Sequence, residues 1–149
     1  MSISKSVHRF PRLDEVRPID LPHHNREDGE LVALEAGAQV PFVIERVFTI
    51  NAPRGAKRGN HAHRRCAQFL LCVCGSVDVY CDDGREHRIF TLDRGVQALL
   101  VPPMIWNTVE FRKAGSVLIV LCNRRYERDD YILDYAEFTS MRNALERQD

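Results

Sequence analysis

The sequence has no surplus of charge of either sign, because its 21 Lys and Arg residues are matched by 21 Asp and Glu residues. A balanced chain has no bulk attraction to nucleic acid or to an anionic membrane. It also lacks long apolar runs, and the longest ones, Phe69–Cys74 and Val117–Cys122, are far too short to span a bilayer. The opening stretch MSISKSVHRF has no apolar signal-peptide core. We therefore expect a cytoplasmic protein that binds neither nucleic acid nor membrane.

A CxxC pair is also missing, although the chain has five cysteines. This absence removes the usual signature of a zinc ribbon or of a thioredoxin-like redox motif. Cys72, Cys74 and Cys81 lie in or beside strand-like runs. Free cysteine behaves as a small apolar residue, so the sequence predicts reduced, buried thiols.

The pattern of apolar residues predicts a small all-β domain. Short strand-like runs are separated by turn signals such as Asp83-Gly84 and Pro102-Pro103. The runs are Val43–Ile50, Gln68–Cys74, Ser76–Cys81, His87–Leu92, Val96–Val101, Val109–Phe111 and Ser116–Cys122. A weak amphipathic helix is expected after Tyr135. With 149 residues and 44% apolar content we expect one domain, with an N-terminal arm (1–28), a barrel (29–125) and a C-terminal segment (126–149), and with a loop at Asp20–Gly29.

Two histidines in the stretch RGNHAH form the main functional candidate. Alternate residues of a strand face the same side, so His61 and His63 should project together. An exposed polar face would explain them without any function. However, Arg58 and the Arg64-Arg65 pair flank them next to an apolar run, and a mixture of Arg and His is suited to binding an anion.

The same pair resembles the start of a cupin metal site, but the remaining ligands are missing. Gln68 stands where cupins have an acidic ligand, and Trp106 or Asn107 stands near the expected third histidine. Two imidazoles alone make a weak site, and a catalytic zinc site needs three protein ligands. Cys66 is three residues from His63, so a regular strand would place it on the opposite face. We expect no metal and no cofactor, with the histidines acting as acid–base groups.

Several longer segments resemble the sugar-nucleotide 3,4-ketoisomerases, a cupin family with a double-stranded β-helix or jelly-roll barrel. The resemblance covers roughly Gly29 to Phe138 and is carried by GELVALEAGAQVPFVIERVFTI (29–50), RGNHAH (58–63), CAQFLLCVCGSV (66–77), VPPMIWNTVEF (101–111) and YERDDYILDYAEF (126–138). It implies conversion of a dTDP-4-oxo-6-deoxyhexose to its 3-oxo isomer. It also implies a homodimer that exchanges an N-terminal strand, with no metal.

The resemblance assigns roles to individual residues. His61 is the expected base, and His63 lies beside it and carries protons between the sugar oxygens. Arg46 and Arg58 are expected to face the diphosphate or sugar, and Arg46 or Gln68 would hold the developing oxyanion. Tyr80, Trp106 and Asn107 complete the candidate substrate-binding set. Phe48, Thr49 and Ala67 occupy positions where many members have two tyrosines and a histidine.

Three other functions remain open. A sugar-nucleotide 3,5-epimerase would also use a histidine base and would need a tyrosine acid, for which Tyr80 and Tyr126 are the candidates. A non-catalytic sugar-nucleotide-binding cupin is the second, and a metal-dependent oxygenase, disfavoured by its ligand count, is the third. The sequence fixes neither the nucleobase nor the configuration at C4 of the product.

Overall fold

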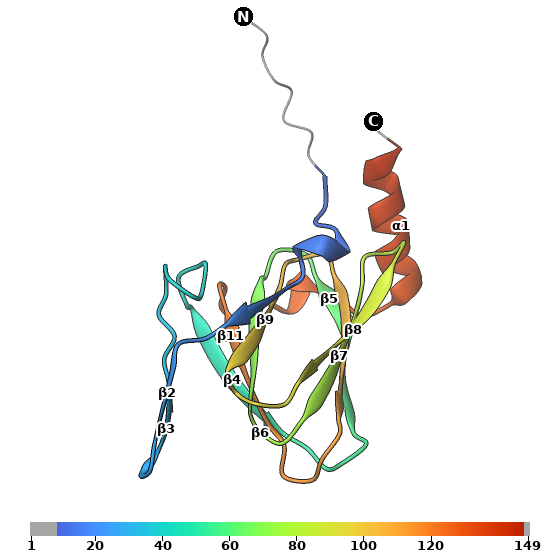
Figure 1. Ribbon diagram of the computed structural model, residues 1–149. Coiled ribbons are helices and arrows are strands. Elements are labelled where there is room, and N and C mark those ends of the chain that lie inside the picture. Colours follow the sequence, from blue (N-terminus) through green and yellow to red (C-terminus); the bar gives the residue numbers. More distant parts are fainter. Residues whose placement is uncertain (1–8, 148–149) are drawn as a thin grey trace, which may run out of the picture.

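The computed structural model describes residues 9–147 and consists of two five-stranded sheets that face each other, with one helix at the side (Figure 1). The first sheet has the order β1-β9-β6-β11-β4 and the second has the order β12-β5-β10-β7-β8. Every pairing within these two sheets is antiparallel. Two facing antiparallel sheets with such crossovers form a jelly roll. The predicted all-β barrel with a C-terminal helix is confirmed.

The strands agree with most of the predicted runs. The first sheet contains β1 (Arg17–Asp20), β4 (Arg46–Asn51), β6 (Gln68–Cys74), β9 (Gln97–Val101) and β11 (Val117–Cys122), and the second contains β5 (Lys57–His63), β7 (Val77–Asp82), β8 (His87–Leu92), β10 (Trp106–Phe111) and β12 (Tyr131–Ile132). A separate hairpin is formed by β2 (His23–Arg26) and β3 (Gly29–Val32), and the helices are η1 (Leu13–Glu15), η2 (Arg128–Asp130) and α1 (Tyr135–Glu146).

The space between the sheets is filled by alternate residues of the strands. On β7, Val77, Val79 and Cys81 are fully buried, while Asp78 and Tyr80 between them are partly exposed. This is the alternation that SVDVYC predicts, since successive side chains of a strand point to opposite faces. The inner side chains of β6, β9, β10 and β11 join the same core.

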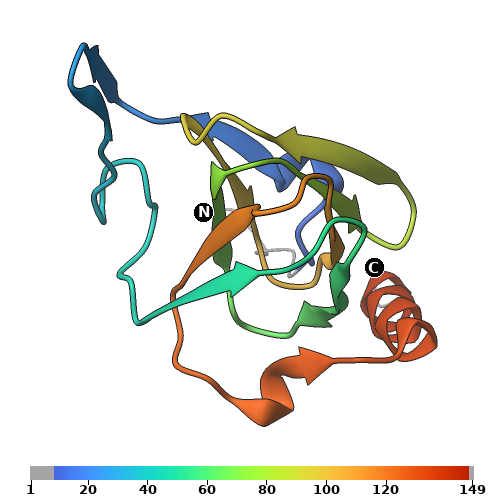
Figure 2. The same ribbon diagram turned by 90° about the horizontal axis from the view of Figure 1, so that it is seen from below.

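The N-terminal part differs from the sequence prediction in two places. The predicted loop at Asp20–Gly29 is wrong, because His23–Arg26 pairs with Gly29–Val32 as a hairpin. Arg17–Asp20, which was assigned to an arm outside the barrel, pairs with β9 as an edge strand of the first sheet. The hairpin extends away from the barrel on the side opposite to α1 (Figures 1 and 2), and its residues are mostly exposed. The expectation drawn from MSISKSVHRF lies largely outside the described residues, as do positions 148–149 of the C-terminal segment.

The C-terminal helix covers the outer face of the second sheet. The carboxylate of Asp134 accepts a hydrogen bond from the backbone N–H of Glu137 and so caps the first turn. Phe138 is fully buried in a cluster with Ala62, Trp106 and Ile132. The helix is therefore packed directly behind β5, the strand that carries both histidines. None of the helices within residues 9–147 is both long enough and apolar enough to cross a membrane.

Candidate active site

The two histidines face the interior of the barrel from the end of β5. Ala62, between them, is fully buried on the outer face beneath α1, so its neighbours point to the opposite side. The ring centroids of His61 and His63 are 4.9 Å apart. The predicted common face is confirmed by this contact. His63 is buried, while His61 is partly exposed and remains accessible to a small molecule.

A bulge in β5 sets the direction of the residues that precede the pair. His61 pairs with Asn107 and Gly59 pairs with Thr108, which leaves Asn60 as an extra residue. Asn60 adopts a left-handed conformation with φ of 57°, and its side chain accepts a hydrogen bond from Thr108 on the outer face. Bulges of this kind change which side chains face the core.

As a result, Arg58 lies on the same face of β5 as His61. Arg58 pairs with Val109, whose side chain belongs to the barrel core. Directly paired residues of an antiparallel ladder share a face. In a regular strand, residues three apart would face opposite sides. The exposed Arg58 guanidinium can therefore reach a ligand that extends from the histidines along the strand.

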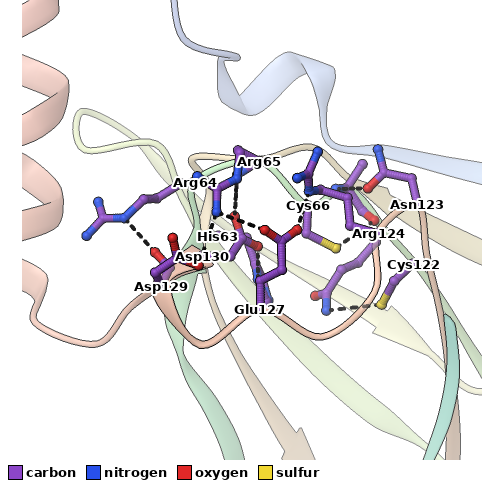
Figure 3. A network of polar contacts seen from close by, with 12 residues as sticks. His63, Arg64, Arg65, Cys66, Cys122, Asn123, Arg124, Glu127, Asp129 and Asp130 are labelled. Atoms are coloured by element: carbon purple, nitrogen blue, oxygen red, sulfur yellow. Dashed lines mark hydrogen bonds and ion pairs between the residues drawn. The ribbon is translucent and has the colours of Figure 1, made fainter. Parts of the chain in front are cut away.

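His63 has a buried carboxylate partner that the sequence analysis did not identify. Its Nδ1 lies 2.9 Å from Oδ2 of Asp130, and the two side chains are 3% and 4% exposed. The other oxygen of Asp130 accepts a hydrogen bond of 2.7 Å from the backbone N–H of Arg65 (Figure 3). A carboxylate can only accept here, so Nδ1 carries the proton. Nε2 of His63 is buried and has no partner among the described residues.

Tyr131 completes the group around the two histidines. Its ring centroid lies 5.2 Å from that of His61 and 4.5 Å from that of His63. Tyr131 belongs to β12, whose pairing with His63 in β5 fixes its position. The segment YERDDY that supplies Asp130 and Tyr131 was noticed in the sequence for its resemblance. Its sequence pattern, however, does not predict that this segment pairs with β5.

Arg46 approaches the same space from the opposite sheet. Its guanidinium lies 5.2 Å from the ring centroid of Phe48 and 5.6 Å from that of Tyr126, and Nη2 lies 3.6 Å from Sγ of Cys122. The cation stacks well on Phe48, so the missing tyrosine hydroxyl does not remove this support. Its Nε is buried with no partner among the described residues. Arg46 therefore keeps a donor for an anionic group.

The histidines are both held in the neutral form. Burial lowers the pKa of His61 from 6.5 to about 4, the neighbouring His63 adds to this, and a hydrogen bond to the backbone of Gly59 opposes it. Burial also lowers the pKa of His63, but here the hydrogen bond to Asp130 opposes the shift. Both imidazoles can accept a proton at neutral pH, and the carboxylate makes His63 the better acceptor.

Gln68 and Asn107, two further predicted binding residues, are both buried on strands of the barrel. Gln68 is buried on β6, and its Nε2 lies 3.8 Å from Sγ of Cys122. Asn107 is buried on β10 directly opposite His61. Both amides are neutral, so they offer hydrogen bonds to a ligand and are poor ligands for a transition metal.

Two of the predicted binding residues are not brought to the histidines. Trp106 lies on the outer face of β10, where its ring packs 5.7 Å from that of Phe138. Tyr80 also faces outward, and its hydroxyl donates to Asp82. The residues before and after each of them face the core instead, because the strand alternates. Trp106 thus packs against α1, and Tyr80 lies on the outer surface of the second sheet.

The cysteines differ from the prediction at two positions. Cys72 and Cys81 are buried as expected, but Cys74 is exposed, because β6 leaves the core at its end. Cys66 was expected to point away from His63. The strand ends at His63, the chain turns, and the Cys66 thiol lies close to both His63 and Asp130. Parity along a strand does not apply beyond the end of that strand.

The fold and the site define a class of protein: a cupin-type barrel with paired histidines on its inner wall. The FdtA family, described as "WxcM-like, C-terminal", matches residues 14–143, and the chain belongs to this family. A curated relative, TDP-4-oxo-6-deoxy-alpha-D-glucose-3,4-oxoisomerase of Aneurinibacillus thermoaerophilus, is 38% identical over 111 residues, which cover 74% of this chain and 80% of the relative.

Solved structures agree with this assignment. A 3,4-ketoisomerase from Helicobacter canadensis is 31% identical with a TM-score of 0.83, over 87% of this chain and 98% of the other. QdtA, a sugar 3,4-ketoisomerase from Thermoanaerobacterium thermosaccharolyticum solved in complex with TDP, is 28% identical with a TM-score of 0.85, over 89% of this chain and 98% of the other. The similarity thus extends over nearly the whole barrel.

Proposed function

We propose that this protein is a sugar-nucleotide 3,4-ketoisomerase that converts a dTDP-4-oxo-6-deoxyhexose to its 3-oxo isomer. The observation that carries the proposal is the buried His63–Asp130 pair, whose unpartnered Nε2 lies in the barrel beside His61 and Tyr131. A base of this kind is what proton abstraction next to a ketone requires. The relatives named above supply the substrate class.

The reaction moves a carbonyl from C4 to C3 without net oxidation. A base removes the C3 proton, which the neighbouring ketone acidifies, and an enediolate forms. The C3 oxygen then loses its proton and the C4 oxygen gains one. Finally, a proton is added to the C4 carbon, which gives the 3-oxo sugar. The atoms and electrons balance within the sugar, so the chemistry calls for acid–base groups and for donors to the oxyanion.

We assign the carbon base to His63 rather than to His61. Asp130 fixes the ring and opposes the loss of basicity that burial causes, whereas the pKa of His61 falls to about 4. A base oriented by a third group is the usual arrangement in such sites. His61 and Tyr131 both contact the ring of His63, and in this assignment they carry protons between the two sugar oxygens.

The remaining residues bind and orient the substrate. Arg46 has an unpartnered Nε and, together with Gln68, supplies donors to the developing oxyanion. Arg58 lies on the same face of β5 as His61, further toward the start of the strand, which supports a role for its guanidinium in binding the diphosphate. Binding energy from that remote group can then hold the sugar in the reactive position.

The epimerase alternative receives less support. Tyr80 donates to Asp82 on the outer face, away from the histidine pair, and Tyr126, 64% exposed, contacts the ring of Tyr131 and not the histidines themselves. The named relatives at the highest identities are 3,4-ketoisomerases.

A single incubation tests the function. Purified protein treated with a chelator is mixed with dTDP-4-oxo-6-deoxyglucose, and the product is followed by NMR. We expect the 3-oxo isomer, with undiminished turnover after chelation. A product inverted at C3 or C5, or an unchanged substrate, would overturn the proposal.

We also propose that the protein is a homodimer and that the β2–β3 hairpin lies at the interface. Apart from Val32, the hairpin residues are exposed in the described part of the chain, and Leu31 is 57% exposed. A two-stranded hairpin is at best marginally stable by itself in water. Packing against a second copy would cover this surface, as the resemblance to strand-exchanged dimers implies.

A further inference from the structure

Three potential metal ligands converge behind the catalytic histidine. One donor atom each from His63, Cys66 and Asp130 lies within 4.8 Å of the other two, and all three residues are buried. The turn after β5 brings them together. The backbone N–H of Arg64 donates to the carbonyl of Asp130 at 2.8 Å, and that of Arg65 donates to its carboxylate at 2.7 Å (Figure 3). This wraps the chain around Asp130 and turns Cys66 back toward it.

A second thiol lies next to Cys66. Cys122, at the end of β11, is fully buried, and its Sγ lies 3.6 Å from Nη2 of Arg46 and 3.8 Å from Nε2 of Gln68. The hydrogen bond from the Cys66 thiol, helped by Arg46, holds the pKa of Cys122 below its ordinary value in spite of burial. The contact with Cys122, together with burial, raises the pKa of Cys66. Cys122 therefore belongs to the surroundings of the three ligands, where it contacts Arg46, Gln68 and Cys66.

The chemistry of this donor set selects a class of ion. One sulfur, an imidazole nitrogen and a carboxylate oxygen suit Zn²⁺, which can take water as its fourth ligand, whereas Mg²⁺ and Ca²⁺ prefer oxygen alone. Zinc–ligand bonds of about 2.0–2.3 Å place tetrahedral ligands ~3.3–3.8 Å apart. The Cys66 sulfur, within 4.8 Å of the other two donor atoms, needs to approach by about 1 Å at most, while Nδ1 of His63 and Oδ2 of Asp130, now 2.9 Å apart, must separate slightly.

We propose that His63, Cys66 and Asp130 form a binding site for Zn²⁺, and that zinc inhibits the enzyme by occupying it. The ion takes the place of the proton between Nδ1 of His63 and the Asp130 carboxylate. The Cys66 thiol and Nδ1 of His63 give up their protons when the ion binds. Such an ion removes the carboxylate contact that sustains His63 as a base. The inhibition rests on the proposed function, but the binding does not.

Cobalt provides a test of binding that needs no activity. The full-length protein is reduced, freed of metal with a chelator and titrated with Co²⁺, which gives a thiolate-to-metal charge-transfer absorption when cysteine coordinates it. We expect this absorption to saturate at one ion per chain and to disappear when Zn²⁺ displaces the cobalt. Cys66→Ser should weaken Zn²⁺ binding by at least ~10-fold, as the loss of metal-site contacts commonly does.

Two further variants keep the test decisive. Cys74→Ser removes the exposed thiol and should bind Co²⁺ and Zn²⁺ as the parent does. Asp130→Asn should weaken binding while leaving both thiols in place. Cobalt binding without charge-transfer absorption, or equal zinc affinity in parent and Cys66→Ser with both proteins folded by circular dichroism, would overturn the site.

The activity measurement separates this proposal from the function. If the protein isomerises the sugar nucleotide, Zn²⁺ should lower turnover, a chelator should restore it, and Cys66→Ser should resist the inhibition. If the protein binds cobalt through Cys66 but turns over no sugar nucleotide, the site stands and the proposed function fails. Isomerase activity that saturating Zn²⁺ leaves unchanged would overturn the inhibitory role alone.

Discussion

Nδ1 of His63 lies 2.9 Å from Oδ2 of Asp130, and the two residues are 67 positions apart in the chain. The contact joins the end of β5 to the 3-10 turn before β12, and both side chains are buried. It fixes the tautomer of the histidine and leaves Nε2 as its free acceptor. The proposed chemistry depends on this pair.

The first prediction separates the two histidines. His63→Asn should abolish exchange of the C3 hydrogen with deuterated water and lower kcat by at least ~10², the lower end of a general-base contribution. His61→Asn should slow the full isomerisation but retain exchange at C3, because it removes the proposed carrier between the oxygens. Nucleotide affinity, measured by calorimetry with dTDP, should change little in either variant.

The opposite pattern has a clear meaning. If His61→Asn loses C3 exchange and His63→Asn keeps the parental rate, the base is His61, as the family resemblance implies. In that case the Asp130 contact is structural.

The second prediction concerns Asp130 as a positioning residue. Asp130→Asn keeps an oxygen that can accept from Nδ1 but removes the charge that opposes the lowered pKa of His63. The pKa of His63 should therefore fall further, and the acid limb of the kcat/KM profile should move to lower pH. We expect kcat to fall by ~10-fold or more with KM nearly unchanged, since the base becomes weaker. A reduced kcat with an unmoved acid limb would contradict this role.

The third prediction uses two glycines with the same backbone strain. Gly75 has φ of 79° and Gly115 has φ of 75°, so alanine is strained at both. A Cβ at Gly75 would lie 2.7 Å from Cα of Ser116, whereas one at Gly115 would meet nothing within 4 Å. Gly115→Ala should cost about 1 kcal/mol of unfolding free energy, and Gly75→Ala at least ~2–4 kcal/mol. Urea unfolding measures both, and equal losses would rule out a contribution from the contact.

The fourth prediction is a loss of stability at mildly acidic pH. The pKa of His61 is about 4 in the folded protein and 6.5 ordinarily, so between these values the unfolded chain binds more protons. The free energy of unfolding should then fall as the pH drops from about 6.5 toward 4. His61→Asn lacks this titration and should show a shallower fall when urea midpoints are compared across that range. Parallel curves for parent and variant would contradict the lowered pKa.

The fifth prediction addresses the assembly. Light scattering at micromolar concentration should give the mass of a dimer, and Leu31→Glu in the hairpin should shift it toward the monomer. Ile89→Glu is the matched control, because Ile89 is also a highly exposed aliphatic residue but lies on β8. A monomeric parent, or equal dissociation in both variants, would contradict an interface at the hairpin.

The barrel strands and the inward direction of the histidines could be predicted because both follow from period-two alternation within one strand. The turn at Asp83-Gly84 could be predicted because the Asp-Gly sequence is itself a local turn signal. What the sequence did not indicate is that the Asp83 carboxylate also accepts from the backbone N–H of Leu13, 70 positions away, at 2.9 Å. Long-range partners of this kind are set by the packing of the whole chain.

The same limit explains the errors. Asp130 and Cys66 reach His63 through a turn and a separate segment, so no spacing along the sequence reveals them. The strand β2 was taken for part of a loop because the sequence of Asp20–Gly29 lacks an apolar side, which is the signal used to recognise a strand. Trp106 was assigned to the substrate because the sequence pattern did not show whether Trp106 or its neighbour Asn107 faces the interior of the barrel.

Ala62 lies between the two histidines and beneath Phe138, with no exposed surface. The helix α1 thus packs against the strand that carries the histidines. A larger side chain at Ala62 or Phe138 would displace β5, because the contact is fully buried. If every single substitution were scored by turnover, positions on α1 and in its contacts with β5 should therefore be sensitive in addition to those of the site. These variants would look like catalytic mutants although none of the side chains concerned touches the sugar.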